Sequence, residues 1–125
     1  MFSIIFVESK LFFDNGNGVK LCGILNRPKE PTTKIVILAH GYGSHKNRPK
    51  YLRFAEEFEK RNIATFRFDF LGRGESEGNF EDITITEGAL EILDAIEIMK
   101  TEGFSSFGLI GVSFGGISSL SLIHI

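Results

Sequence analysis

Cysteine, tryptophan and long apolar runs are scarce or missing in this chain. Its 125 residues include one cysteine, which cannot form an internal disulfide and fits a reducing compartment. We therefore expect a cytoplasmic protein in which Cys22 is a small buried residue. No window approaches the roughly 18 apolar residues of a membrane span, and residues 1–7 lack the basic start of a signal peptide. A membrane span is therefore not expected.

The chain also lacks an excess of charge of either sign. It has 14 Lys and Arg against 16 Asp and Glu, interspersed along the sequence, so there is no basic stripe for nucleic acid. Histidine and cysteine do not occur at metal-ligand spacing, so we expect neither a metal nor another cofactor. The glycines at 72, 74 and 78 match neither a dinucleotide fingerprint nor a P-loop, which makes a nucleotide-binding module a weak alternative.

Strand-like and helix-like segments alternate along the sequence. Two β-type runs at about residues 3–13 and 19–26 flank Asn-Gly pairs, which predicts an antiparallel hairpin. The continuously apolar run 35–39 is typical of a strand covered on both faces in a parallel sheet. A helix starting at Pro49 has its apolar residues at i, i+3, i+4 and i+7, and a further strand is expected at 63–68.

A second helix is predicted to begin at Thr84, which forms a capping box with Glu87. Its apolar residues share one face, and we expect Glu91, Asp94 and Glu97 to fall largely on the opposite face. Together, these segments predict an α/β fold in which an amino-terminal antiparallel hairpin leads into a mostly parallel sheet with flanking helices.

The motif Gly-Val-Ser-Phe-Gly at residues 111–115 follows the apolar run 107–110 and precedes small residues that can open a helix. A sharp strand-to-helix turn would expose Ser113 as a nucleophile, and Gly111 and Gly115 would sit where a Cβ collides. An isolated pattern of this kind would more often be a Gly/Ser-rich turn. The strand-then-helix context favours the nucleophile.

Two further motifs precede this elbow. His-Gly-Tyr-Gly at residues 40–43 follows the strand at 35–39, and Phe-Asp-Phe-Leu-Gly-Arg-Gly-Glu-Ser occupies residues 68–76. In this order, over residues 19–122, the three motifs resemble the amino-terminal half of α/β-hydrolases. The closest likeness is to the esterase, monoacylglycerol-lipase-like and serine-aminopeptidase-like branch.

The resemblance implies hydrolysis of small ester or related acyl substrates with Ser113 as the nucleophile. The backbone N–H groups of Tyr42 and Phe114 would then donate to the developing oxyanion. His40, beside Gly41, resembles the histidine that braces this loop, and Asp69 resembles a structural turn residue more than a catalytic one.

The base and acid of such a triad are not evident in this chain. In this fold they follow the nucleophile, but the 12 residues after Ser113 contain one histidine and no acid. His124 would lie about 16 Å along the same predicted helix, whereas a base must come within about 3 Å. His45, on the loop after the first motif, is more simply a solvated residue.

We therefore expect residues 1–125 to be the amino-terminal portion of one hydrolase domain, inactive or nearly so alone. The alternative is a non-catalytic truncated product or interaction module. One edge of the strand before Ser113 would have no protein partner in this chain, and an apolar edge promotes self-association.

Overall fold

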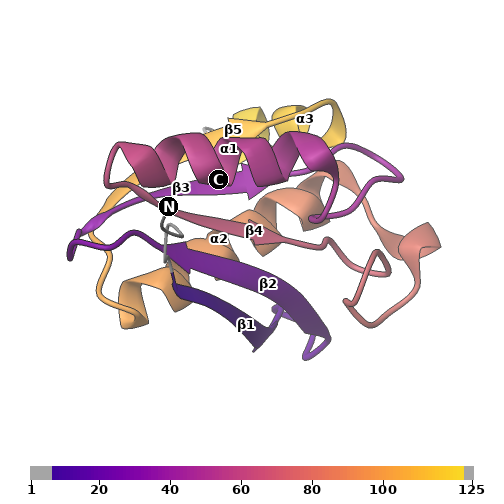
Figure 1. The fold of residues 1–125 in the computed structure, drawn as a ribbon. Coiled ribbons are helices and arrows are strands. Elements are labelled where there is room, and N and C mark those ends of the chain that lie inside the picture. Colours follow the sequence, from indigo (N-terminus) through magenta and orange to yellow (C-terminus); the bar gives the residue numbers. More distant parts are fainter. Residues whose placement is uncertain (1–6, 123–125) are drawn as a thin grey trace.

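The computed structural model describes residues 7–122, which form one five-stranded sheet with helices on both faces (Figure 1). In chain order, the elements are β1 (Val7–Asp14), β2 (Lys20–Arg27), β3 (Lys34–Ala39), α1 (Pro49–Lys60), β4 (Ala64–Phe68), the 3₁₀ turn η1 (Phe80–Asp82), α2 (Ile85–Thr101), β5 (Ser106–Gly111) and α3 (Phe114–Ser121). Residues 1–6 and His124 lie outside the described residues, so the structure does not test the predictions made for them.

The strands lie in the order β1-β2-β4-β3-β5. β1 pairs with β2, and β2 with β4, in antiparallel fashion, whereas β3 pairs in parallel with both β4 and β5. The predicted α/β class is confirmed: an antiparallel hairpin leads into parallel strands connected by helices. Within the described residues no helix is long and apolar enough to cross a membrane.

β3 is buried on both faces, which explains its unbroken apolar sequence. Ile35 and Ile37 belong to the larger core under α2, while Val36 and Leu38 pack with Tyr51 of α1 on the opposite face. Figure 1 shows α1 on one side of the sheet and α2 with α3 on the other. Cys22 is also fully buried, as predicted.

The predicted Thr84 cap of α2 is confirmed. However, Glu91, which was predicted on the solvent-facing side of this helix, does not lie there. The Thr84 side chain accepts a hydrogen bond from the N–H of Glu87. Glu91 is fully buried, because the β1–β2 turn and the segment after β4 cover its side of the helix. Its carboxylate accepts hydrogen bonds from Asn15 Nδ2 and from the N–H of Leu71.

The connections from β3 run in two directions across the sheet. The β3–α1–β4 connection leads to one side of β3, and the connection through α2 brings β5 to its other side, with Ala39 opposite Gly111. In open α/β sheets such a reversal leaves a crevice at the carboxyl ends of the strands. The loop after β3 and the turn after β5 therefore meet at this edge.

Candidate functional site

Ser113 lies in the turn between β5 and α3, where the chain reverses direction within two residues. Its backbone φ of 52° and ψ of −114° fall in a region that non-glycine residues rarely adopt. The residue is exposed, and its side chain makes no capping hydrogen bond to α3. The turn thus presents a hydroxyl that the helix itself does not use.

The two glycines of the motif permit this tight turn. A Cβ on Gly111 would lie 2.5 Å from the carbonyl oxygen of Gly115. One on Gly115 would lie 2.3 Å from the carbonyl oxygen of Ala39. Neither backbone oxygen can move far, so a side chain at either position would force α3 away from the sheet.

The loop after β3 lies directly beside the turn. The N–H of Val112 donates to the carbonyl of Ala39 at 3.1 Å, which extends the β3–β5 pairing to the turn. A Cβ on Gly41 would lie 3.4 Å from the Cβ of Ser113. The fold therefore brings together the first and third sequence motifs, with the Gly41 backbone facing Ser113.

His40 fixes the start of this loop. Its Nδ1 donates to the carbonyl of Gly41 at 2.8 Å, and its Nε2 accepts from the N–H of Phe70 at 3.1 Å. Burial lowers the pKa of His40 to about 4, so the ring is neutral near pH 7. In a trans peptide unit the C=O and N–H point in opposite directions, so the bond to Gly41 also orients the N–H of Tyr42.

The first residue of α3 places a second backbone N–H beside Ser113. Because Phe114 starts the helix, no carbonyl one turn earlier is available to its N–H. The turn formed by residues 41–44 closes through the N–H of Ser44, not that of Tyr42. Within residues 7–122, neither predicted donor takes part in the hydrogen bond that closes its own turn.

Asp69 is the centre of a buried ion cluster. Its carboxylate accepts from the backbone N–H and the Nζ of Lys46, at 2.7 and 2.6 Å, and from the N–H of Glu75 at 2.9 Å. A Cβ on Gly74 would collide with this carboxylate. Burial acts to lower the pKa of Lys46, but its bonds to Asp69 and Glu75 outweigh this and raise it. The cluster holds the two loops together.

Three aromatic rings from different segments form one cluster next to Ser113. The ring of Tyr42, with 64% of the residue exposed, lies 4.7 Å from that of Phe80 and 5.9 Å from that of Phe114, measured between centroids. Phe80 belongs to η1, far along the chain from the elbow. Neither Phe80 nor the buried Lys46 was predicted from the sequence, since nothing in the local pattern indicates either contact.

The two described histidines form hydrogen bonds to the backbone. Both ring nitrogens of His40 are engaged, and Nδ1 of His45 accepts from the N–H of Asn47 at 3.2 Å. Within residues 7–122, neither ring is hydrogen-bonded to a carboxylate, and no group of three His, Cys, Asp or Glu could hold a metal ion.

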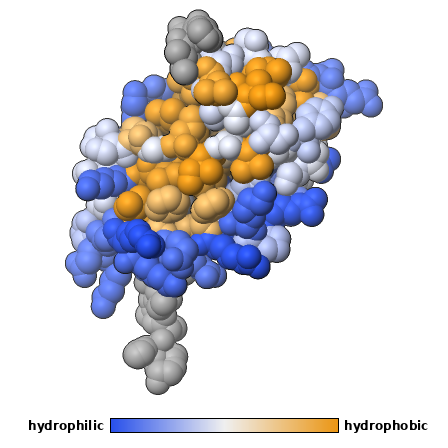
Figure 2. All heavy atoms as spheres, turned by 90° about the horizontal axis from the view of Figure 1, so that it is seen from above, coloured by the Kyte–Doolittle hydropathy of each residue, from blue (hydrophilic) through white to orange (hydrophobic). Residues whose placement is uncertain are grey.

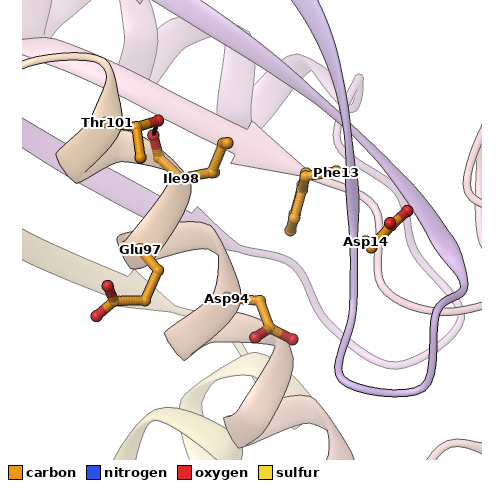
Figure 3. Close-up of a pocket in the computed structure, with 6 residues that line it drawn as sticks. All are labelled: Phe13, Asp14, Asp94, Glu97, Ile98 and Thr101. Atoms are coloured by element: carbon orange, nitrogen blue, oxygen red, sulfur yellow. Dashed lines mark hydrogen bonds between the residues drawn. The ribbon is translucent and has the colours of Figure 1, made fainter.

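A surface pocket lies away from this site, between the end of β1 and the carboxyl half of α2 (Figure 3). Its lining residues are Phe13, Asp14, Asp94, Glu97, Ile98 and Thr101. None of them was predicted as a site residue, and none contacts the turn at Ser113.

Comparisons with known proteins identify a family. A family model described as serine aminopeptidase, S33, matches residues 30–124. A search of curated proteins finds no match. Among solved structures, Est1E from Butyrivibrio proteoclasticus, with ferulic acid bound, is 28% identical with a TM-score of 0.81. The alignment covers 91% of this chain and 47% of that one.

Two further solved structures are similar. The Pyrococcus furiosus esterase Pf2001 is 26% identical with a TM-score of 0.79, over 92% of this chain and 45% of its own. The α/β hydrolase GrgF from Penicillium sp. sh18 is 25% identical with a TM-score of 0.81, over 92% and 40%. This chain therefore spans less than half the length of each.

Proposed function

Because the chain belongs to the serine aminopeptidase S33 family of α/β-hydrolases, we propose that it carries the nucleophile and oxyanion donors of a serine hydrolase acting on esters or related acyl substrates. The observation that carries this proposal is the strained, exposed Ser113 facing the loop after β3. The similarity to Pf2001, an esterase, supports ester substrates.

In the proposed reaction the Oγ of Ser113 attacks the acyl carbon and its proton passes to a base. The carbonyl oxygen becomes an oxyanion held by the N–H groups of Tyr42 and Phe114, and the leaving group departs with the proton from the base when the carbonyl re-forms. Water then attacks the acyl–Ser113 ester in the same way, which releases the acid and returns the proton to Oγ of Ser113. We propose that the base and acid come from outside residues 7–122. Alone, the 125-residue chain is expected to retain only the small acceleration that the donors and substrate binding provide.

The test is covalent trapping of Ser113 by an alkyl phosphonofluoridate, with free imidazole added as the base. The Oγ–P bond forms, the P–F bond breaks, fluoride leaves and the proton passes to imidazole. We expect one phosphonyl group per chain, mapped to Ser113 by peptide mass spectrometry. Its rate of formation is expected to rise with imidazole concentration.

Two variants serve as controls for this reaction. Ser113→Ala should abolish the adduct, whereas Ser105→Ala, which removes an exposed serine at the opposite end of β5, should leave it unchanged. Equal labelling of several serines, or an adduct that persists in Ser113→Ala, would contradict the assignment of Ser113 as nucleophile.

A second candidate function is a non-catalytic interaction module. The observation that favours it is the exposed apolar surface of β5 and α3, where Leu109, Ile117 and Leu120 are 37%, 52% and 65% exposed. Figure 2 shows a broad apolar area on the side of the molecule where β5 and α3 lie in Figure 1. Self-association through this edge is the form that we propose. The cytoplasmic location stays a prediction from the sequence.

A further inference from the structure

Arg73 lies between two glycines in the segment after β4 and reaches across to the loop after β3. We call residues 41–44 the oxyanion loop. The Nε of Arg73 donates to the carbonyl of Ser44 at 3.0 Å, and its Nη2 donates to the carbonyl of Gly43 at 2.5 Å. A planar guanidinium can hold two neighbouring carbonyls in a fixed geometry, which a single ammonium cannot.

The same side chain also contacts the aromatic cluster of the site. The Arg73 Cζ lies 5.1 Å from the centroid of Phe80, whose ring packs against Tyr42. A guanidinium over an aromatic face is held there by cation–π attraction. Arg73 therefore restrains Tyr42 twice: through the backbone that follows it and through the ring beside it.

Two other hydrogen bonds also restrain the oxyanion loop, and one of them acts on the peptide unit that contains the Gly43 carbonyl. His40 holds the carbonyl of Gly41, and the turn closes with a bond from Ser44 to the same carbonyl. Gly43 has a φ of 74°, a conformation that glycine adopts more easily than other residues. Arg73 is the side chain that binds the carbonyls of Gly43 and Ser44.

From these contacts we infer that Arg73 is a positioning residue of the site: it holds the oxyanion loop so that the N–H of Tyr42 faces the oxyanion formed at Ser113. This inference rests on the proposed function. Because Arg73 is not inferred to contact the substrate, loss of its side chain should weaken the stabilisation of the oxyanion without weakening substrate binding.

The first measurement is hydrogen exchange by mass spectrometry on the 125-residue chain. In Arg73→Gln, peptides covering residues 41–47 should exchange about tenfold faster, because a charge-assisted hold on the loop is lost. In Arg73→Lys, the same peptides should be only partly protected from exchange. The exchange of peptides from α2 should be unchanged in both variants. Arg53→Gln, which removes an exposed arginine of α1, should match the wild type.

The second measurement separates positioning from a general structural effect. The phosphonylation rate of Ser113 is measured against reagent concentration with imidazole present. Arg73→Gln should lower the limiting rate about tenfold, since a misplaced oxyanion donor loses much of its effect. The reagent concentration at half the limiting rate should not change, and Arg73→Lys should not restore the full rate.

Unchanged exchange over residues 41–47 in Arg73→Gln would overturn the inference. So would an unchanged limiting rate, or a loss of rate accompanied by faster exchange throughout the chain. If wild-type Ser113 is not labelled at all, the proposed function fails. The exchange data then decide separately whether Arg73 holds the loop.

Discussion

Glu91 is a carboxylate in the interior of the protein, on the face of α2 covered by the β1–β2 turn. Burial raises the pKa of Glu91 to about 7, although its bonds from the Leu71 N–H and from Asn15 act in the opposite direction. Because the folded-state pKa lies above the unfolded value, the folded chain binds an extra proton between the two. The protonated Glu91 side chain contributes fully to the free energy of unfolding below the pKa that it has in the unfolded chain. This contribution is lost as the pH rises toward 7.

We therefore predict that the chain loses stability relative to Glu91→Gln as the pH rises. Between pH 5 and pH 8 the wild type should lose about 2 kcal/mol of unfolding free energy relative to the variant. Urea unfolding at both pH values measures this difference. Glu97→Gln, at an exposed position of the same helix, should follow the wild type. A constant difference between wild type and Glu91→Gln across this range would contradict the pKa assignment.

At the scale of elements, the periodicity of the sequence predicted the strands and helices well. The apolar run of β3, Pro49 at the start of α1 and the Thr84 cap of α2 are local signals that act on their own segments. The Gly-Val-Ser-Phe-Gly motif and its flanking residues also predicted that β5 turns sharply into α3. Such features can be read from the sequence because each depends on neighbouring residues.

Contacts between distant segments could not be read in this way. Glu91 has the spacing of a solvent-facing residue, and only the covering loops make it buried. Lys46 binds the carboxylate of Asp69, and Arg73 binds backbone carbonyls of the oxyanion loop; in both cases the partner is distant in sequence. A backbone carbonyl also leaves no signature in the sequence. The sequence motifs predict where the candidate site lies, whereas they do not predict the side chains that hold its loops in place.

The junction of β5 and α3 depends on how closely α3 approaches the sheet. Gly115→Ala should destabilise the chain by about 3 kcal/mol, because its Cβ would meet the Ala39 carbonyl oxygen at 2.3 Å. Gly116→Ala, one residue along the same helix, meets its nearest atom at 3.3 Å and should change stability by less than about 1 kcal/mol. Urea unfolding of both variants is the measurement. Equal effects would show that the close approach is not required.

At the scale of the whole molecule, the two edges of the sheet differ. β1 carries the exposed charged residues Glu8, Lys10 and Asp14, which discourage pairing with another chain. β5 has no charged residue and, within the part of the chain that the structure describes, pairs only with β3. The adjoining surface of α3 is apolar as well (Figure 2). If the chain associates, this is the edge we expect it to use.

Light scattering during size exclusion at several protein concentrations tests this expectation. We predict a dimer fraction that rises with concentration and that Leu120→Lys abolishes, because the charge would be buried in the contact. Leu90→Lys introduces the same change at an exposed leucine of α2 and should leave the dimer intact. A wild-type chain that stays monomeric at every concentration would remove the interaction-module alternative.

The most direct test of the site is a crystal structure of the phosphonylated chain, since the bound phosphonyl oxygen imitates the oxyanion. The proposed chemistry predicts phosphorus bonded to Oγ of Ser113, with one oxygen about 3 Å from the backbone nitrogens of both Tyr42 and Phe114. A phosphonyl oxygen pointing into solvent, away from both N–H groups, would contradict the oxyanion site. An adduct on another residue would contradict the central role of Ser113.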